Sequence, residues 1–142
     1  MAAGRKLFAE KGFHGTSLRE ITADAQANLG AVTYHFKTKE ALYHAILEDV
    51  LGDLSSRIEA AARGHGTPPE RLRGIVQATF GFFTAAPDAP QLVVRELAHG
   101  TPPAPFARMA RRNLAAVTQV VRDGQKHAVF RDIEPILVAF SL

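Results

Sequence analysis

The sequence predicts an all-α fold. Apolar residues recur every three or four positions along most of its 142 residues, which is the spacing of one face of a helix. No run alternates apolar and polar residues as a half-buried strand would. Capping residues precede the apolar stripes and glycine or proline follows them, so the chain divides into seven predicted helices and the start of an eighth.

The first two predicted helices are short. Leu7 and Phe8 lie on one face of the first helix, and Gly12 is suited to a left-handed cap that ends it. Ser17 and Glu20 have the spacing of a capping box, in which the Ser17 hydroxyl accepts from the Glu20 N–H and the Glu20 carboxylate accepts from the Ser17 N–H. We therefore expect the second helix to begin directly after Ser17.

A polar break separates this helix from a third helix of about two turns. Asn28 is a good N-cap for the third helix. Its inward-facing stripe is expected to consist of Leu29, Val32 and Phe36. Thr38 is the N-cap of a much longer helix, expected over about residues 39–64.

Proline and glycine mark the remaining predicted helices. Thr67 and Glu70 again have capping-box spacing, and Pro68 occupies the first helical position, where proline is tolerated. Residues 101–105 are rich in proline and are expected to be irregular. The predicted helices cover residues 67–86, 89–99, 106–127 and, in part, 132–142.

The composition excludes several kinds of site. Without cysteine the chain has no disulfide, no thiolate nucleophile and no cysteine-ligated metal. Its six histidines are scattered and show no metal-ligand spacing, and no GxSxG, GxGxxG or phosphate-binding glycine loop is present. We therefore expect no enzyme activity, no metal and no cofactor.

Charge and hydropathy carry little information about partners. The net charge is +3, with six basic against four acidic side chains in residues 1–44, which permits a nucleic-acid partner without requiring one. The longest uncharged stretch, residues 74–87, is shorter than the ~20 apolar residues of a spanning helix. The N-terminus lacks a signal-peptide pattern. We expect a cytoplasmic protein.

Residues 17–36 have the pattern of a helix-turn-helix: two short helices separated by a polar break. The second helix of such a motif must be held by a buried stripe while its other face approaches the major groove. The residues left facing outward are Gly30, Ala31, Thr33, Tyr34 and His35. Small residues beside Tyr and His are unusual on a plain surface helix, which normally carries Glu and Lys, but they suit close approach to DNA.

Three segments, residues 7–13, 16–21 and 30–42, resemble the TetR/AcrR (tetracycline-repressor-type) family of bacterial regulators. The resemblance covers about residues 2–47. It implies an N-terminal three-helix DNA-binding head over residues 1–47. It also implies a C-terminal helical bundle over residues 48–142 that senses a ligand and forms a homodimer. The implied function is that of a repressor that releases a pseudo-palindromic operator when it binds a small molecule.

The resemblance also implies which residues contact DNA. The positions carried over are Ser17, Arg19, Asn28, Leu29, Gly30, Ala31, Thr33, Tyr34, His35 and Lys39. Tyr34, His35 and Lys39 match positions that contact phosphates. Position 29 departs from the family because it holds Leu where a Lys or Gln is frequent. The family also has a further turn before Ala2 and a last long helix beyond residue 142, so both ends of the chain are expected to be incomplete.

Other interpretations of these residues remain open. Tyr34 could be a half-buried aromatic that ties its helix to the head, and His35 and Lys39 could be ordinary surface residues. The whole chain could be a helical protein-binding adaptor without DNA or ligand function.

The body of the chain offers residues for a ligand pocket between bundle helices. The candidates are Thr79, Phe80, Phe83, Arg95, His99, Met109 and Asn113. Any of the apolar ones could instead belong to an ordinary core, and Arg95 and Glu96 could be a surface pair. Arg108, Arg111 and Arg112 form a cluster that would normally be solvated, with an anionic effector as the lesser alternative.

Overall fold

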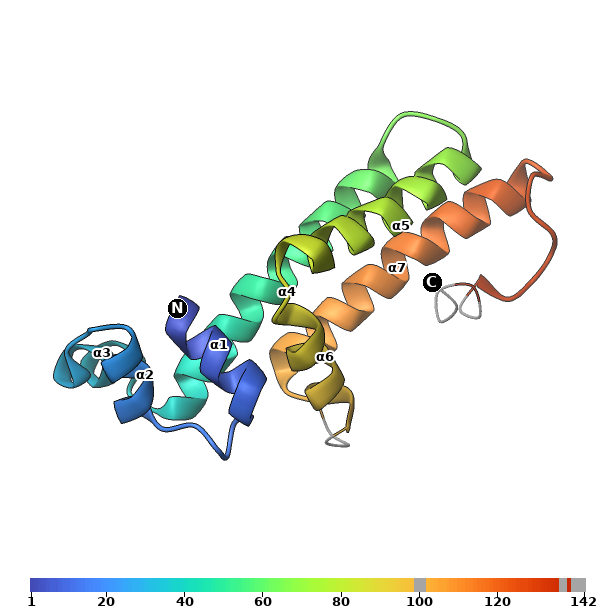
Figure 1. Ribbon diagram of the computed structural model, residues 1–142. Helices are drawn as coiled ribbons and strands as arrows, with labels where there is room; N and C mark the ends of the chain where they lie inside the picture. Colours follow the sequence, from blue (N-terminus) through green and yellow to red (C-terminus); the bar gives the residue numbers. More distant parts are fainter. Residues whose placement is uncertain (99–101, 136–137, 139–142) are drawn as a thin grey trace. The chain divides into compact units, whose positions relative to one another are not determined.

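The computed structural model describes residues 1–98, 102–135 and 138, and over these residues it is all-helical (Figure 1). The helices are α1 (Ala2–Lys11), α2 (Leu18–Asp24), α3 (Leu29–Phe36), α4 (Lys39–Arg63), α5 (Pro68–Ala85), α6 (Ala89–Ala98) and α7 (Ala104–Lys126). The predicted fold class is confirmed. No helix of the described residues is long and apolar enough to cross a membrane.

The structure corrects the predicted start of the last long helix. α7 begins at Ala104, two residues before the predicted start, with Pro105 in its first turn, where the missing N–H costs no hydrogen bond. The last two residues of the segment predicted to be irregular, 101–105, are therefore helical. The helix predicted over 132–142 falls mostly on residues outside the described part of the chain.

The chain forms two compact units. The first comprises Met1–Val50 and Ala86–Phe106, and the second comprises Leu51–Ala85 and Ala107–Leu142. Residues 86–106 therefore cluster with the first fifty residues, whereas the predicted domain division assigned them to the C-terminal domain. α4 is continuous through the boundary, and its first twelve residues belong to the first unit.

An aromatic and aliphatic core holds the first unit together. Phe8, Leu47 and Leu92 are fully buried, so α1, α4 and α6 each contribute to this core. The Phe8 ring packs edge-on against Tyr43 at 4.8 Å between centroids. Burial of these side chains fixes the start of α4 relative to α1.

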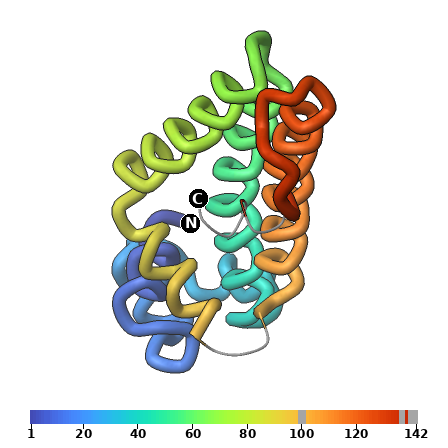
Figure 2. Tube along the Cα trace, turned by 90° about the vertical axis from the view of Figure 1, so that its right-hand side faces the viewer, coloured from blue at the N-terminus to red at the C-terminus, as the bar shows by residue number. Residues whose placement is uncertain are grey.

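In the second unit, α7 runs alongside the second half of α4, and α5 starts near the end of α4 and diverges from it (Figures 1 and 2). Leu54, Ile75 and Val120 are buried, one from each of the three helices. Arg71 on α5 links them: its guanidinium donates to the Ala62 carbonyl and lies 3.1 Å from Asp123.

Candidate DNA-binding head and ligand pocket

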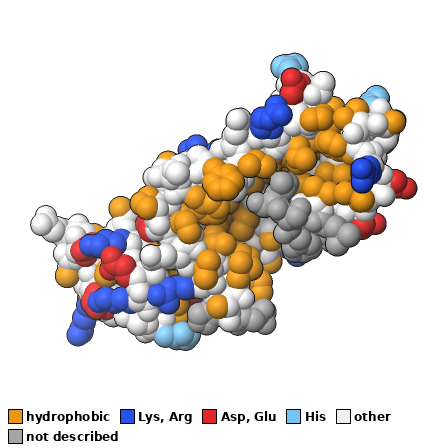
Figure 3. All heavy atoms as spheres, turned by 45° about the vertical axis from the view of Figure 1, so that its right-hand side comes forward, with side chains coloured by type: hydrophobic (Ala, Val, Ile, Leu, Met, Phe, Trp, Pro, Cys, Tyr) orange, Lys and Arg blue, Asp and Glu red, His pale blue; other side chains and the backbone are white. Residues whose placement is uncertain are grey.

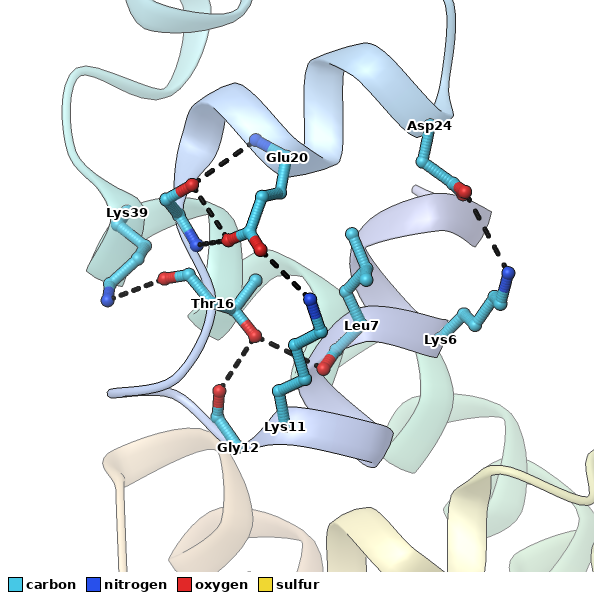
Figure 4. A network of polar contacts seen from close by, with 9 residues as sticks. Lys6, Leu7, Lys11, Gly12, Thr16, Glu20, Asp24 and Lys39 are labelled. Atoms are coloured by element: carbon cyan, nitrogen blue, oxygen red, sulfur yellow. Dashed lines mark hydrogen bonds and ion pairs between the residues drawn. The ribbon is translucent and has the colours of Figure 1, made fainter.

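The capping box predicted for α2 is present. The Ser17 Oγ accepts from the Glu20 N–H at 3.2 Å, and the Glu20 carboxylate accepts from the Ser17 N–H at 2.9 Å. Lys11 at the end of α1 adds an ion pair of 2.9 Å to the same carboxylate (Figure 4). The hydrogen bond from Lys11 is the main cause that lowers the pKa of Glu20 to about 2, and those from Ser17 add to it. α2 therefore starts at a fixed point next to the end of α1.

Hydrogen bonds from Thr16 and from Lys39 hold the loop between α1 and α2. Thr16 is buried, and its hydroxyl donates to the carbonyls of Leu7 and Gly12. The Lys39 ammonium, at the start of α4, donates to the carbonyls of Phe13 at 2.7 Å and Thr16 at 2.9 Å (Figure 4). It also lies 4.4 Å from the centroid of the Phe13 ring. Two of the three N–H donors of Lys39 are thus used within the head, so the phosphate contact implied by the resemblance stays a prediction.

α3 lies on the surface of the head. Asn28 caps it as predicted, since its Oδ1 accepts from the Ala31 N–H at 3.1 Å. Val32 and Phe36 are half-buried and hold the helix, whereas Leu29 is 36% exposed. The expected inward position of Leu29 is wrong, since Leu29 is one of the exposed large apolar residues of the structure. No residue of α3 is fully buried.

The outward face of α3 is as predicted. Its members are all exposed: Gly30, Ala31, Thr33, Tyr34 and His35. Tyr34 is 79% exposed, so the alternative of a half-buried Tyr34 is wrong. The Lys37 ammonium lies 4.3 Å from the centroid of the Tyr34 ring. Ser17 and Arg19, at the start of α2, are exposed as well. The head thus presents a continuous set of exposed groups on α2 and α3.

Within the first unit, α6 is bonded to α1 and α4 through polar contacts that the sequence did not predict. The Arg95 guanidinium donates to the carbonyls of Ala9 and Glu10 at the end of α1. Glu96 is buried and accepts a hydrogen bond from the Tyr43 hydroxyl, so Arg95 and Glu96 are not a surface pair. Burial is the main cause that raises the pKa of Tyr43, and the contact with Glu96 adds to it.

A pocket of about 340 Å³ lies in the second unit. The residues that line it are Leu54, Ile58, Ile75, Val76, Thr79, Phe80, Ala110, Arg111, Asn113, Leu114 and Val117. Figure 3 shows apolar side chains gathered over the part of the chain that holds α5 and α7. A mainly apolar pocket between helices is a typical small-molecule site.

The pocket contains only some of the predicted ligand residues. Thr79, Phe80 and Asn113 line it. Phe83 and Met109 are not part of its lining: Phe83 packs edge-on against Phe82, and Met109 is buried with its sulfur accepting from the Asn113 amide. Arg95 belongs to the first unit. His99 lies outside the described residues.

Comparison with known proteins agrees with this geometry. The family model of bacterial regulatory proteins of the tetR family matches residues 1–46, which include α1–α3 and the start of α4. A solved bacterial regulatory protein in the tetR family from Rhodococcus RHA1 is 29% identical, with a TM-score of 0.84 over 99% of this chain and 75% of its own. Residues 1–46 thus belong to the TetR family of bacterial regulatory proteins.

Two further relatives have informative descriptions. The HTH-type transcriptional repressor DhaR of Mycobacterium sp. (strain GP1) is 32% identical over 68 residues, which are 48% of this chain and 34% of DhaR. AibR, solved in complex with isovaleryl coenzyme A and operator DNA, is 19% identical with a TM-score of 0.79 over 98% of this chain and 77% of its own, a likeness of fold alone. The chain thus spans about a third of the length of DhaR.

Proposed function

We propose that this chain is a ligand-responsive, DNA-binding transcriptional regulator, most simply a repressor, and that it acts as a homodimer in the cytoplasm rather than as an enzyme. The observation that carries the proposal is the exposed face of α3. A helix capped by Asn28, held only by Val32 and Phe36, and exposing small residues can enter a major groove without steric conflict.

The remaining DNA contacts follow from the same geometry. Ser17 and Arg19 stand exposed at the start of α2, where hydroxyl and guanidinium groups can bind phosphates. Two heads related by a twofold axis would place their α3 helices in successive major grooves, about 34–36 Å apart. A pseudo-palindromic operator is the DNA that matches such a dimer. DhaR, described as a transcriptional repressor, supports this direction of regulation.

The effector site proposed here is the pocket lined by Thr79, Phe80 and Asn113. α4 contributes Leu54 and Ile58 to its lining and Lys39 to the head, so one helix serves both the pocket and the DNA-binding unit. A bound effector would shift the equilibrium between DNA-binding and released states by its difference in affinity for the two. AibR, solved with both a coenzyme A ester and operator DNA, is a fold relative in which both partners are present.

Fluorescence anisotropy with DNA from upstream of the protein's own gene tests the proposal. We expect tight, salt-dependent binding that exceeds binding to a scrambled duplex of equal length. Sedimentation equilibrium of the same sample should give the mass of a dimer. Equal affinity for the native and scrambled duplexes would leave the protein-binding adaptor as the better interpretation.

A further inference from the structure

The pocket of the second unit has one charged group in its lining, Arg111. Within the described part of the chain this guanidinium forms no hydrogen bond or ion pair, whereas its neighbour Arg112 is paired with Glu59 at 2.8 Å. None of the described residues that line the pocket is acidic. The first acid along α7 is Asp123, which is already bonded to Arg71 and Gln119. The one charged group in the described lining is therefore a cation without an ion-pair partner among the described residues.

The rest of the lining is apolar apart from two groups. Thr79 donates its hydroxyl proton to the Ile75 carbonyl at 2.9 Å, so it offers a ligand only its lone pairs. The Asn113 amide is weakly held: its NH₂ donates to the Met109 sulfur, and its Oδ1 is buried without a partner in the described chain. The unbonded amide oxygen can only accept, so it does not select a carboxylate; the Asn113 NH₂ has a second N–H that can donate to a ligand oxygen.

We propose that the effector is a small molecule with an apolar body and a single acidic group, and that the acidic group binds Arg111. This inference rests on the proposed function, in which this pocket is the effector site. A cationic ligand would meet Arg111 without any compensating carboxylate. A neutral apolar ligand would fill the apolar wall but gain nothing from the guanidinium. An acid gains both, because guanidinium and carboxylate match in charge and in hydrogen-bond geometry.

Three eight-carbon probes test this inference: octanoate, octan-1-ol and octylamine, each titrated by calorimetry into the whole chain without DNA. They share an apolar body and differ only in the head group. Because Arg111 is exposed at the pocket rim, solvent screens the interaction, and we expect octanoate to bind about tenfold more tightly than octan-1-ol. Octylamine should bind more weakly than either.

Variants locate the binding and identify the charge. Arg111→Gln should lower octanoate affinity about tenfold and leave octan-1-ol affinity unchanged. Arg122→Gln is the matched control, since Arg122 is an exposed arginine on the same helix that does not line the pocket. Ala110→Phe adds bulk to the lining from an exposed position and should weaken octanoate and octan-1-ol alike.

The outcomes separate this inference from the proposed function. Equal affinities for octanoate and octan-1-ol, an Arg111→Gln variant that binds octanoate like the wild type, or no binding of hexanoate, octanoate or decanoate would each overturn it. If octanoate binds through Arg111 but DNA affinity is unchanged by it, the ligand class stands and ligand-controlled DNA binding fails. If the chain binds no DNA, the calorimetric result is unaffected.

Discussion

The Lys39 ammonium donates a hydrogen bond of 2.9 Å to the Thr16 carbonyl, across 23 positions of the sequence. This contact joins the start of α4 to the loop that sets the beginning of α2. A charged donor shared between two backbone carbonyls stiffens the head at the point where α1, α2 and α4 meet.

Replacing this lysine should destabilise the head. Lys39→Met keeps an unbranched apolar side chain but removes the ammonium that donates to two carbonyls and lies over the Phe13 ring, so we expect the free energy of unfolding in urea to fall by about 1 kcal/mol. Lys126→Met, at an exposed lysine at the end of α7, is the control and should change it by less than about 0.5 kcal/mol. Equal effects of the two substitutions would contradict the bracing role of Lys39.

Glu20 should give the head a pH-dependent part of its stability. Its pKa is lowered from 4.5 to about 2 in the folded chain, first by the hydrogen bond from Lys11 and then by those from Ser17. A lowered pKa means that the stabilisation is present above pH 4.5 and is lost as the pH falls towards 2. The destabilisation caused by Glu20→Gln should therefore be greatest at neutral pH and shrink over that range.

Urea unfolding of the wild type and Glu20→Gln at a series of pH values measures this difference. Gln still completes a capping box, so the substitution tests the carboxylate charge rather than the helix start. Glu10→Gln is the control, because the exposed Glu10 carboxylate forms no ion pair or hydrogen bond within the described part of the chain, and this substitution should change stability little. A Glu20→Gln effect that is constant from pH 7 to 2 would show that the ion pair contributes no stability.

Local chemistry made the head predictable from sequence. The caps formed by Ser17, Asn28 and Thr38 depend on groups only three residues apart, and each is observed. The outward face of α3 follows from helical periodicity alone. Such features need no knowledge of which distant segments meet.

Contacts across long sequence separations were not predictable. Arg95 reaches carbonyls 85 and 86 positions away, which no spacing rule reveals; from the sequence it is a candidate for a pocket residue or for a surface pair with Glu96. The sequence predicts that both Phe80 and Phe83 line the ligand pocket, because residues three apart share a broad face of a helix. The structure separates them, since Phe80 lines the pocket and Phe83 packs against its neighbour Phe82.

The hydrogen bond from Tyr43 to Glu96 should be worth a measurable part of the stability of the first unit. Tyr43→Phe leaves the buried Glu96 carboxyl without this donor, so we expect a loss of about 1–3 kcal/mol in the free energy of unfolding. Tyr34→Phe removes a hydroxyl from an exposed tyrosine and should change stability by less than about 0.5 kcal/mol. Denaturant unfolding of both variants makes the comparison, and indistinguishable midpoints would contradict the prediction.

Two substitutions on the exposed face of α3 test its proposed entry into the major groove. Tyr34→Ala should weaken binding to every duplex alike, because a phosphate contact carries no sequence information. Thr33→Ala should instead change the preference among bases, by about 1–3 kcal/mol at one base pair. Anisotropy titrations against the native operator and duplexes with single base-pair changes distinguish the two effects.

Gln77→Ala is the control for both substitutions, since Gln77 is exposed on α5 in the second unit. It should leave affinity and base preference unchanged. If Thr33→Ala and Tyr34→Ala also behave like the wild type, α3 is not the element that enters the groove. The exposed start of α2 at Ser17 and Arg19 would then be the next surface to vary, because its hydroxyl and guanidinium groups are exposed and can bind phosphates.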